Sequence, residues 1–295
     1  MKHGPSLAKS ILISSIALDE SPRSAREWLV LISLTEGWHS NESDASEAAE
    51  KWEERFLDLL TQELSDLNQL GRFCPYEFNS SSPYLIQGSA FIEPRDDAET
   101  QEAKRRKAQH SKYAVALTEL TPRAFEALCA GVLELLGVRE PSVTSYSADE
   151  GIDFYGEWGL GGHQSSSVTS AWVEKQLSVW MLGQAKHHTV GQVSTFEVRE
   201  LVGAVELAKG RAYGSAGEKY RELQLRVCDP VFYLFFTTGR ISSASWRLIY
   251  KSGVAAMDGN MIASFLAERG IGADEGGVFQ EDTFTEWIAK YNSAD

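Results

Sequence analysis

The chain has 295 residues, of which 43% are apolar, and its 28 Lys and Arg stand against 42 Asp and Glu, for a net charge of −14. The apolar content excludes a wholly disordered protein, and no run approaches the ~20 apolar residues that a membrane span requires. The length fits one large or two modest domains. Three cysteines without zinc-like spacing favour buried thiols in a reducing compartment, so we expect a cytoplasmic protein with no membrane partner.

The acidity is uneven along the chain. Residues 1–100 hold 8 Lys and Arg against 18 Asp and Glu, whereas residues 101–295 hold 20 against 24. This balance excludes a general binder of bulk nucleic acid, but it leaves room for a local basic face in the second part. We therefore expect a protein partner that helps to deliver the substrate.

Residues 1–100 are expected to form an acidic, mainly helical module with a partner or specificity role. The apolar run Lys9–Leu18 predicts a helix or strand, and Ser24–Trp38 predicts a short amphipathic helix. Two later apolar runs, Tyr84–Gln87 and Ala90–Glu93, predict a small hairpin.

A long helix is predicted over Ser43–Leu70, with Ser43 or Asp44 as its N-cap. One apolar stripe recurs along it at spacings of three and four residues. Burial inside the module is the favoured interpretation, and docking of a partner helix is the alternative. The stripe consists of Trp52, Phe56, Leu60, Leu64 and Leu67.

Residues 101–115 are expected to be a charged linker or exposed helix between the two parts. They contain the basic run Lys104–Lys107, which follows several acidic residues. A patch that contacts phosphate groups and a solvated face that balances the acids are equally open interpretations.

Residues 116–295 are predicted to form an α/β domain with a mixed central β-sheet flanked by helices. Its first helix is well signalled, because Thr121 suits the N-cap, Pro122 the first helical position and Gly137 the residue after the C-terminus. Glu126 lies next to the apolar face of this helix. Without further information, a surface glutamate favoured by the helix dipole is the preferred interpretation of Glu126.

The central pattern is a pair of apolar runs, Ile152–Trp158 and Leu177–His188, that are predicted to form a β-hairpin. Side chains two apart on a strand project from the same face, so Gln184 and Lys186 are expected to point together. Asp153 lies at the start of the neighbouring run. A carboxylate, an amide oxygen and an ammonium group can therefore converge on one small patch.

This trio suits metal-assisted hydrolysis. Mg²⁺ prefers hard oxygen ligands and keeps several waters, and a metal-bound water becomes a nucleophile at neutral pH. A nearby lysine can orient that water or offset charge that develops on a phosphate. The residues alone thus indicate that hydrolysis of a phosphodiester is chemically feasible.

The rest of the domain continues the alternation of helices and strands. The apolar strand predicted over Pro230–Thr238 is expected to be buried on both faces, as in the centre of an α/β sheet. The predicted elements are a helix over Val193–Lys209, this strand over Pro230–Thr238, a helix from Ser243, an edge strand over Val254–Met257, a helix over Asn260–Arg269 and a last helix within Phe279–Tyr291.

Several polar residues flank these elements. Thr238, Arg240 and Ser242 precede a helix and could contact phosphate groups, with simple capping preferred for Ser242. Arg199 and Glu200 are expected to face nucleic acid or the site.

Other polar features receive structural interpretations. His187 and His188 could serve as acids or contact phosphate groups, but they point to opposite faces, so at most one shares the Lys186 side. Both lack zinc-like partners, and surface or packing roles are preferred for both. Asp149 is interpreted as a turn cap, and Gly159–Thr169 as a loop.

The order of motifs resembles the Mrr-like restriction endonucleases of the PD-(D/E)XK nuclease superfamily, over roughly residues 117–272. Two insertions, at about 159–176 and 211–226, depart from the family pattern, and Gln184 stands where the wider superfamily has Glu or Asp. The motifs are Phe125-Glu126-x-Leu128, Gly151-Ile152-Asp153, Gln184-Ala185-Lys186, Val198 to Ala204, Phe235 to Gly239 and Met257-Asp258-Gly259.

The resemblance implies roles for individual residues. Asp153 and Gln184 would be metal ligands, with the Ala185 carbonyl as a further ligand. Lys186 would be the catalytic lysine, and Glu126 an accessory acidic residue.

The resemblance also implies a Mg²⁺-dependent or Mn²⁺-dependent DNA endonuclease of a bacterial restriction or antiviral defence system. We expect a homo-oligomer, because cleavage of both strands needs two sites. The alternatives are a non-cutting DNA-binding or assembly subunit and a nuclease that resolves branched DNA, and an RNA target also remains open.

Overall fold

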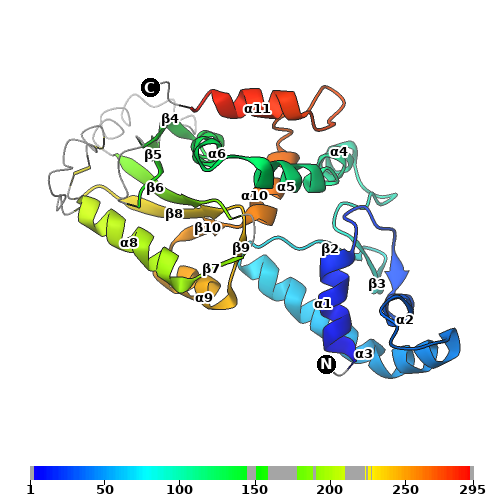
Figure 1. Cartoon of the computed structure of the whole chain (residues 1–295). Coiled ribbons are helices and arrows are strands. Elements are labelled where there is room, and N and C mark those ends of the chain that lie inside the picture. The colour runs from blue at the N-terminus through cyan, green and yellow to red at the C-terminus, as the bar shows by residue number, and fades with distance from the viewer. Residues whose placement is uncertain are drawn as a thin grey trace, which may run out of the picture. The chain divides into compact units, whose positions relative to one another are not determined.

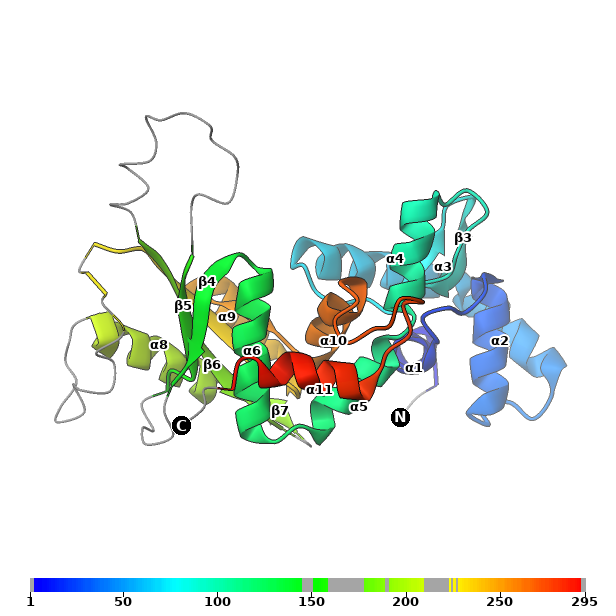
Figure 2. The same cartoon turned by 90° about the horizontal axis from the view of Figure 1, so that it is seen from above.

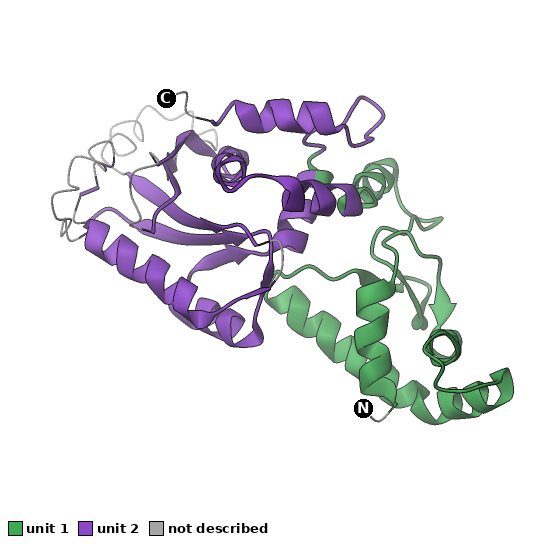
Figure 3. Ribbon diagram, in the orientation of Figure 1, with its two compact units in different colours: residues 1–110, 267–269 green, residues 111–266, 270–295 purple. Residues whose placement is uncertain are grey.

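The computed structural model describes residues 3–144, 151–158, 178–188, 191–209, 223, 225–226 and 228–292. The chain forms two compact units, coloured separately in Figure 3. The first comprises Met1–His110 with Ala267–Arg269, and the second comprises Ser111–Leu266 with Gly270–Asp295. Asp149, the loop 159–169 and most of both insertions lie outside the described residues.

The first unit combines helices with a small antiparallel sheet of strand order β1-β3-β2. The predicted hairpin exists, but it pairs β2 with β3, and residues 90–93 belong to no strand. The elements are α1 (Pro5–Ser15), β1 (Arg23–Ser24), α2 (Ala25–Thr35), α3 (Glu42–Gln69), β2 (Tyr76–Asn79), β3 (Ser82–Gly88) and α4 (Ala98–Lys107).

The long helix α3 begins one residue earlier than predicted. Its N-cap is Asn41, whose side chain accepts a hydrogen bond from the Asp44 amide, so neither Ser43 nor Asp44 is the cap. Phe56, Leu60 and Leu67 are buried, and Trp52 and Leu64 pack against the same core. This confirms that the apolar stripe of α3 is core of its own unit.

The basic run at 104–107 lies at the end of α4 and is largely ion-paired. The Lys104 ammonium is 2.9 Å from Asp96 and 3.4 Å from Glu77, and Arg105 and Arg106 both pair with Glu102. These pairs favour the interpretation of a solvated face that balances the acids.

The second unit is built on a five-stranded mixed sheet of order β10-β8-β6-β5-β4. The strands β6, β8 and β10 run parallel, whereas β5 pairs antiparallel with both β6 and β4. The predicted fold class, an α/β domain with a mixed central sheet, is thereby confirmed. The strands are β4 (Val138–Val143), β5 (Phe154–Trp158), β6 (Val179–Lys186), β8 (Val231–Thr237) and β10 (Ala255–Met257).

Helices cover both faces of this sheet, as Figures 1 and 2 show. Helix α6 packs on β4, β5 and β6, while α8 and α9 pack on the opposite face. A short parallel pair, β7 with β9, connects the chain just before the first residues of α8 and α9. The remaining elements are α5 (His110–Glu119), α6 (Pro122–Leu135), β7 (Gln192–Val193), α8 (Thr195–Lys209), β9 (Arg240–Ile241), α9 (Ser243–Ser252), α10 (Gly259–Glu268) and α11 (Glu281–Ala289).

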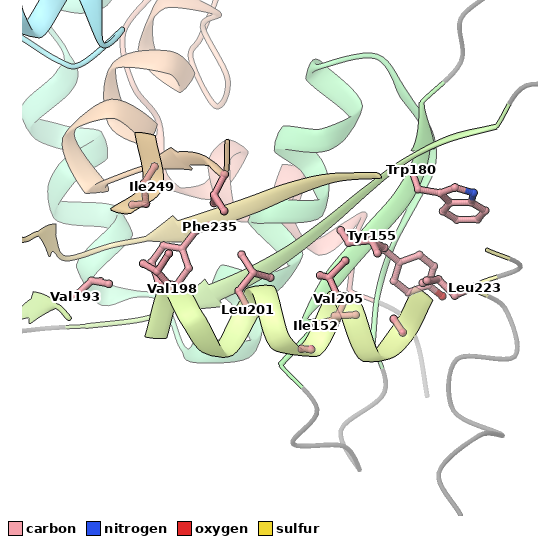
Figure 4. Packing of buried hydrophobic residues seen from close by; sticks show 14 of the residues in the cluster. Ile152, Tyr155, Trp180, Val193, Val198, Leu201, Val205, Leu223, Phe235 and Ile249 are labelled. Carbon is pink, nitrogen blue, oxygen red and sulfur yellow. The ribbon is translucent and has the colours of Figure 1, made fainter. Parts of the chain in front are cut away.

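The core under α8 explains why these segments fold as they do. Apolar residues at helical spacing on α8 meet side chains from one face of the sheet, as Figure 4 shows. The residues in this contact include Ile152, Tyr155, Leu182, Val198, Leu201, Val205, Phe235 and Ile249.

Two expectations need correction, on the burial of β8 and of the cysteines. The strand β8 is buried only in its second half, because Phe232 is 47% exposed. Cys129 is buried, but Cys74 is only partly buried and Cys228 is exposed. None of the helices in the described ranges is long and apolar enough to span a membrane.

Helix α6 is packed tightly against α11 at Gly131. A Cβ added there would lie 2.5 Å from Trp287 Cη2 and 2.7 Å from Tyr291 Cε2. In α8, by contrast, no described atom lies within 4 Å of the corresponding position at Gly203.

These two glycines give a matched test of the packing. We expect Gly131→Ala to lower the free energy of unfolding by about 1–3 kcal/mol, because the added methyl group forces the helices apart. Gly203→Ala should raise it by about 0.5–1 kcal/mol through helix propensity alone. Chemical denaturation of both variants measures the difference, and equal effects would contradict the packing described.

Candidate active site

The pairing of β5 with β6 sets the site. Phe154 lies directly opposite Gly183, and the Phe154 ring stacks on Phe236 at a centroid distance of 5.3 Å. A Cβ on Gly183 would lie 2.1 Å from the Phe154 ring, so only glycine leaves room for this contact. The contact fixes the register and brings Asp153, the residue before Phe154, to the end of β6.

Asp153 is held at this end by two hydrogen bonds. Its amide donates to the Gly183 carbonyl at 2.9 Å, and its Oδ2 accepts from the Ala185 amide at 2.7 Å. The N–H and C=O groups of one strand residue point to the same side, so the Ala185 carbonyl also faces Asp153. The Ala185 carbonyl is therefore on the same side of β6 as the Asp153 carboxylate.

The environment of Asp153 is partly dry. Burial raises the pKa of its carboxyl group to about 6, with smaller increases from the negative charges of Glu126 and Glu200. The Ala185 N–H and the Lys186 charge act in the opposite direction. A raised carboxyl pKa indicates a group that gains from a bound cation, because the cation offsets the cost of burying the charge.

Gln184 supplies a second oxygen. Its side chain is 1% exposed, and among the described residues Oε1 has no hydrogen-bond partner. An unsatisfied buried oxygen costs about 1–3 kcal/mol, which a ligand at that position would recover. The sharp turn at Gly151 (φ 77°) packs against this side chain and against Ala204 of α8.

Lys186 lies on the same face of β6 as Gln184, as the spacing predicts. Its ammonium is 3.6 Å from Glu200 Oε2 of α8, and both side chains are partly exposed. The expectation that Glu200 faces the site therefore holds, whereas the Arg199 guanidinium lies 3.5 Å from Thr195 of its own helix.

Glu126 of α6 is linked to the backbone of Asp153 through Arg123 and Thr144. Arg123 Nη1 donates to Glu126 at 2.9 Å and to the Thr144 carbonyl at 2.7 Å, and Thr144 N donates to the Asp153 carbonyl at 2.9 Å. Arg123 and Thr144 were missed from the sequence. Arg123 lies one helical turn before Glu126, a spacing that could have revealed the pair.

The two histidines lie on opposite sides of the chain, as the alternation predicts. His187 contacts Phe125 of α6 edge-on, with a centroid distance of 6.0 Å. His188 points toward α8, where its Nε2 is 3.1 Å from Glu197 Oε1. Sequence reasoning preferred a surface or packing role for His188, because nothing in the sequence pairs it with Glu197, nine residues later.

The donor set fits a hard divalent cation. Within the ranges that the structure describes, no three His, Cys, Asp or Glu side chains gather as metal ligands. The candidate donors are instead one carboxylate, one amide oxygen and one backbone oxygen, from Asp153, Gln184 and Ala185. Mg²⁺ is commonly bound by a few protein oxygens, with water completing its shell.

Comparison with known proteins gives one family match. The model described as a restriction endonuclease (Mrr_cat) matches residues 117–214, about one third of the chain. The matched range contains Glu126, Asp153, Gln184 and Lys186. No curated protein matches the sequence.

Two solved structures are similar to this chain over part of their length. One is MspJI restriction endonuclease in complex with a 27-mer oligonucleotide, at 20% identity and a TM-score of 0.39, covering 69% of this chain and 41% of that chain. The other is the DNA modification-dependent restriction endonuclease AspBHI, at 16% identity and a TM-score of 0.40, covering 73% of this chain and 47% of that chain. This chain thus spans less than half the length of either enzyme.

The burial of Asp153 predicts a pH-dependent stability in the absence of metal. Its folded pKa of about 6 exceeds the unfolded value near 3.9, so the fold favours the protonated form. Stability should therefore fall as pH rises from about 4 to about 6 and stay low above that range. Asp153→Asn should remove this loss and gain about 1–3 kcal/mol at pH 8 but little at pH 4. Denaturation in chelator measures both, and a gain independent of pH would contradict the assignment.

The family match covers the part of the chain that contains the Glu126, Asp153 and Gln184–Lys186 motifs. The recognition of the Mrr-like pattern is confirmed for residues 117–214, which match the restriction endonuclease family model.

Proposed function

We propose that this protein is a Mg²⁺-dependent DNA endonuclease that hydrolyses phosphodiester bonds, with Mn²⁺ as an alternative ion. The observation that carries the proposal is the buried Gln184 Oε1, which has no hydrogen-bond partner among the described residues, at the strand end where Asp153 Oδ2 accepts from the Ala185 amide. The restriction endonuclease match over the same residues supports nucleic acid as the substrate class.

Each residue has a distinct task in this proposal. Asp153, Gln184 and the Ala185 carbonyl would hold the metal, which when bound supplies an activated water and polarises the phosphate. Lys186 orients the attacking water and offsets negative charge on the phosphate oxygens. Glu200 restrains the Lys186 ammonium at the rim of the site.

Glu126 is assigned an accessory role. Its carboxylate adds negative charge near Asp153, while Arg123 ties it to the backbone at Thr144. This second acid strengthens the attraction of the site for a cation and for the waters around it.

We also propose that residues 1–100 form a module that binds a protein partner and that the enzyme serves a restriction or antiviral defence system as a homo-oligomer. The module holds 8 Lys and Arg against 18 Asp and Glu, and it therefore carries most of the net negative charge of the chain. A hollow on α3 lined by Glu50, Glu53, Glu54, Asp58 and Tyr84 supports a basic partner surface.

The central test is cleavage of plasmid and linear DNA with Mg²⁺ or Mn²⁺. Asp153→Ala and Lys186→Ala should each lower the rate by about 10²–10³-fold or more, because each removes a group that acts on the reacting phosphate. Lys209→Ala serves as the control and should cut normally, because this lysine is in the same unit and its ion pair among the described residues is with Glu206. Cleavage by Asp153→Ala at the wild-type rate would refute the proposal.

The same assay separates the alternatives. A preference for four-way junctions over linear duplex would indicate a nuclease for branched DNA. Binding without any cleavage would indicate an assembly subunit, and cleavage of RNA alone would change the substrate class.

A separate measurement tests the metal ligands without relying on activity. Gln184→Ala should weaken Mg²⁺ binding about tenfold, and Gln184→Glu should restore or exceed the wild-type affinity through its added charge. Isothermal titration gives both constants. Unchanged affinity in Gln184→Ala would remove Gln184 from the ligand set.

A further inference from the structure

A polar cavity lies beside the candidate active site. It has a volume of ≈ 470 Å³ and opens where β6, β8 and β10 end in the second unit. Ligands of open α/β sheets commonly bind outside the carboxyl ends of the strands. The polar side chains that line it include His188, Gln192, Thr238, Arg240, Asp258 and Asn260.

Close backbone contacts fix the chain segments that line this cavity. A Cβ on Gly259 would lie 2.3 Å from the Thr238 carbonyl oxygen, and one on Gly239 would lie 3.0 Å from His188 Cβ. The buried Thr238 hydroxyl accepts from the His188 amide at 2.9 Å and donates to the His188 carbonyl at 3.1 Å. The wall that carries His188 is therefore fixed to the end of β8.

The His188 ring is fixed as well. Its Nε2 is 3.1 Å from Glu197 Oε1, and because a carboxylate can only accept, Nε2 carries the hydrogen. The other oxygen of Glu197 accepts from the Ser194 amide at 2.6 Å and from its hydroxyl at 2.9 Å. Glu197 and Glu200 of α8 thus hold His188 and Lys186, two residues apart on one chain segment.

Arg240 is the cation on the other wall. It lines the cavity, its side chain is exposed, and no carboxylate of the described residues forms an ion pair with it. The acid in the lining, Asp258, is engaged in capping α10, where its Oδ1 accepts from the Met261 amide at 3.1 Å. The arrangement leaves an Arg fork and an oriented imidazole facing one polar space.

We propose that this cavity binds a second phosphodiester group of the nucleic acid, next to the phosphate that is cut, through Arg240 and His188. Glu197 is a positioning residue for His188. The inference rests on the proposed function and adds a subsite to it. Arg forks match phosphate oxygens. With Nε2–H held by Glu197, His188 donates to a phosphate oxygen from Nδ1 in its doubly protonated form, in which both ring nitrogens are donors. Two residues of extended chain span about 6–7 Å, so His188 lies about that far from Lys186 along the protein chain.

The first experiment measures binding of a labelled DNA duplex in Ca²⁺, and cleavage in Mg²⁺. Arg240→Ala and His188→Gln should each weaken binding and raise KM about tenfold while kcat stays within about twofold. The slope of log Kd against log salt should fall by about one for Arg240→Ala. Glu197→Gln should give a smaller loss, because the ring keeps an acceptor but loses the charge.

Arg247→Ala is the matched control, since this exposed arginine of α9 lies outside the lining of the cavity. It should leave binding, KM and the salt slope unchanged. If Arg240→Ala and His188→Gln behave like Arg247→Ala while wild type cuts DNA, the subsite is wrong and the proposed function stands. If wild type binds but does not cut, and Arg240→Ala still weakens binding, the subsite stands and the nuclease assignment fails. If wild type binds no nucleic acid, both are wrong.

A chemical substitution in the DNA identifies the contacted group. Once the cleavage position is mapped, one neutral methylphosphonate replaces the phosphate on either side of it. At the contacted position this should weaken wild-type binding about tenfold and leave Arg240→Ala unaffected, because the two changes remove the same interaction. Additive losses at both positions would overturn the proposal. Equal loss from an abasic nucleotide instead would assign the cavity to a base.

Discussion

The contact between Phe154 and Gly183 is the constraint on which the site depends. A one-residue slip of β5 against β6 would turn every side chain of β5 to the other face and carry Asp153 away from Ala185. The absence of a side chain at Gly183 allows the Phe154 ring to lie over the strand and stack on Phe236. An apolar contact on the α6 side of the sheet thereby sets the position of the polar groups at its end.

The polar groups at this end are arranged in balanced pairs. Lys186 faces Glu200, His188 faces Glu197, and Arg123 faces Glu126. Among the described residues, the Asp153 carboxylate receives one backbone hydrogen bond, from the Ala185 amide, and the Gln184 oxygen receives none. Burial makes both groups costly to leave without a cation, so their environment favours metal binding.

Helix α8 links the candidate metal site to the neighbouring cavity. Its apolar face forms the core under the sheet, while Glu197 and Glu200, one turn apart, orient side chains from the end of β6. A rigid element that supports both places at once can keep two successive groups of an extended ligand at a fixed spacing. The excess of acidic residues is concentrated in residues 1–100. Basic and acidic residues are therefore closer to balance in residues 101–295, which contain α8, than in the whole chain.

The sequence by itself determined the elements and the local geometry. Alternation on β6 places Gln184 and Lys186 on one face, and the Thr121-Pro122 cap and Gly137 bound α6. The motif order over roughly residues 117–272 resembles the restriction endonuclease pattern, which the family model matches at residues 117–214. These features depend on neighbours in the chain, whose periodicity is visible in one sequence. Only the tertiary structure decided what lies across space from them: the register of β5, the burial that raises the pKa of Asp153, the Glu197–His188 pair and the cavity at the strand ends. Such pairings join residues remote in sequence, and the packing of the sheet against its helices selects them, which periodicity cannot reveal.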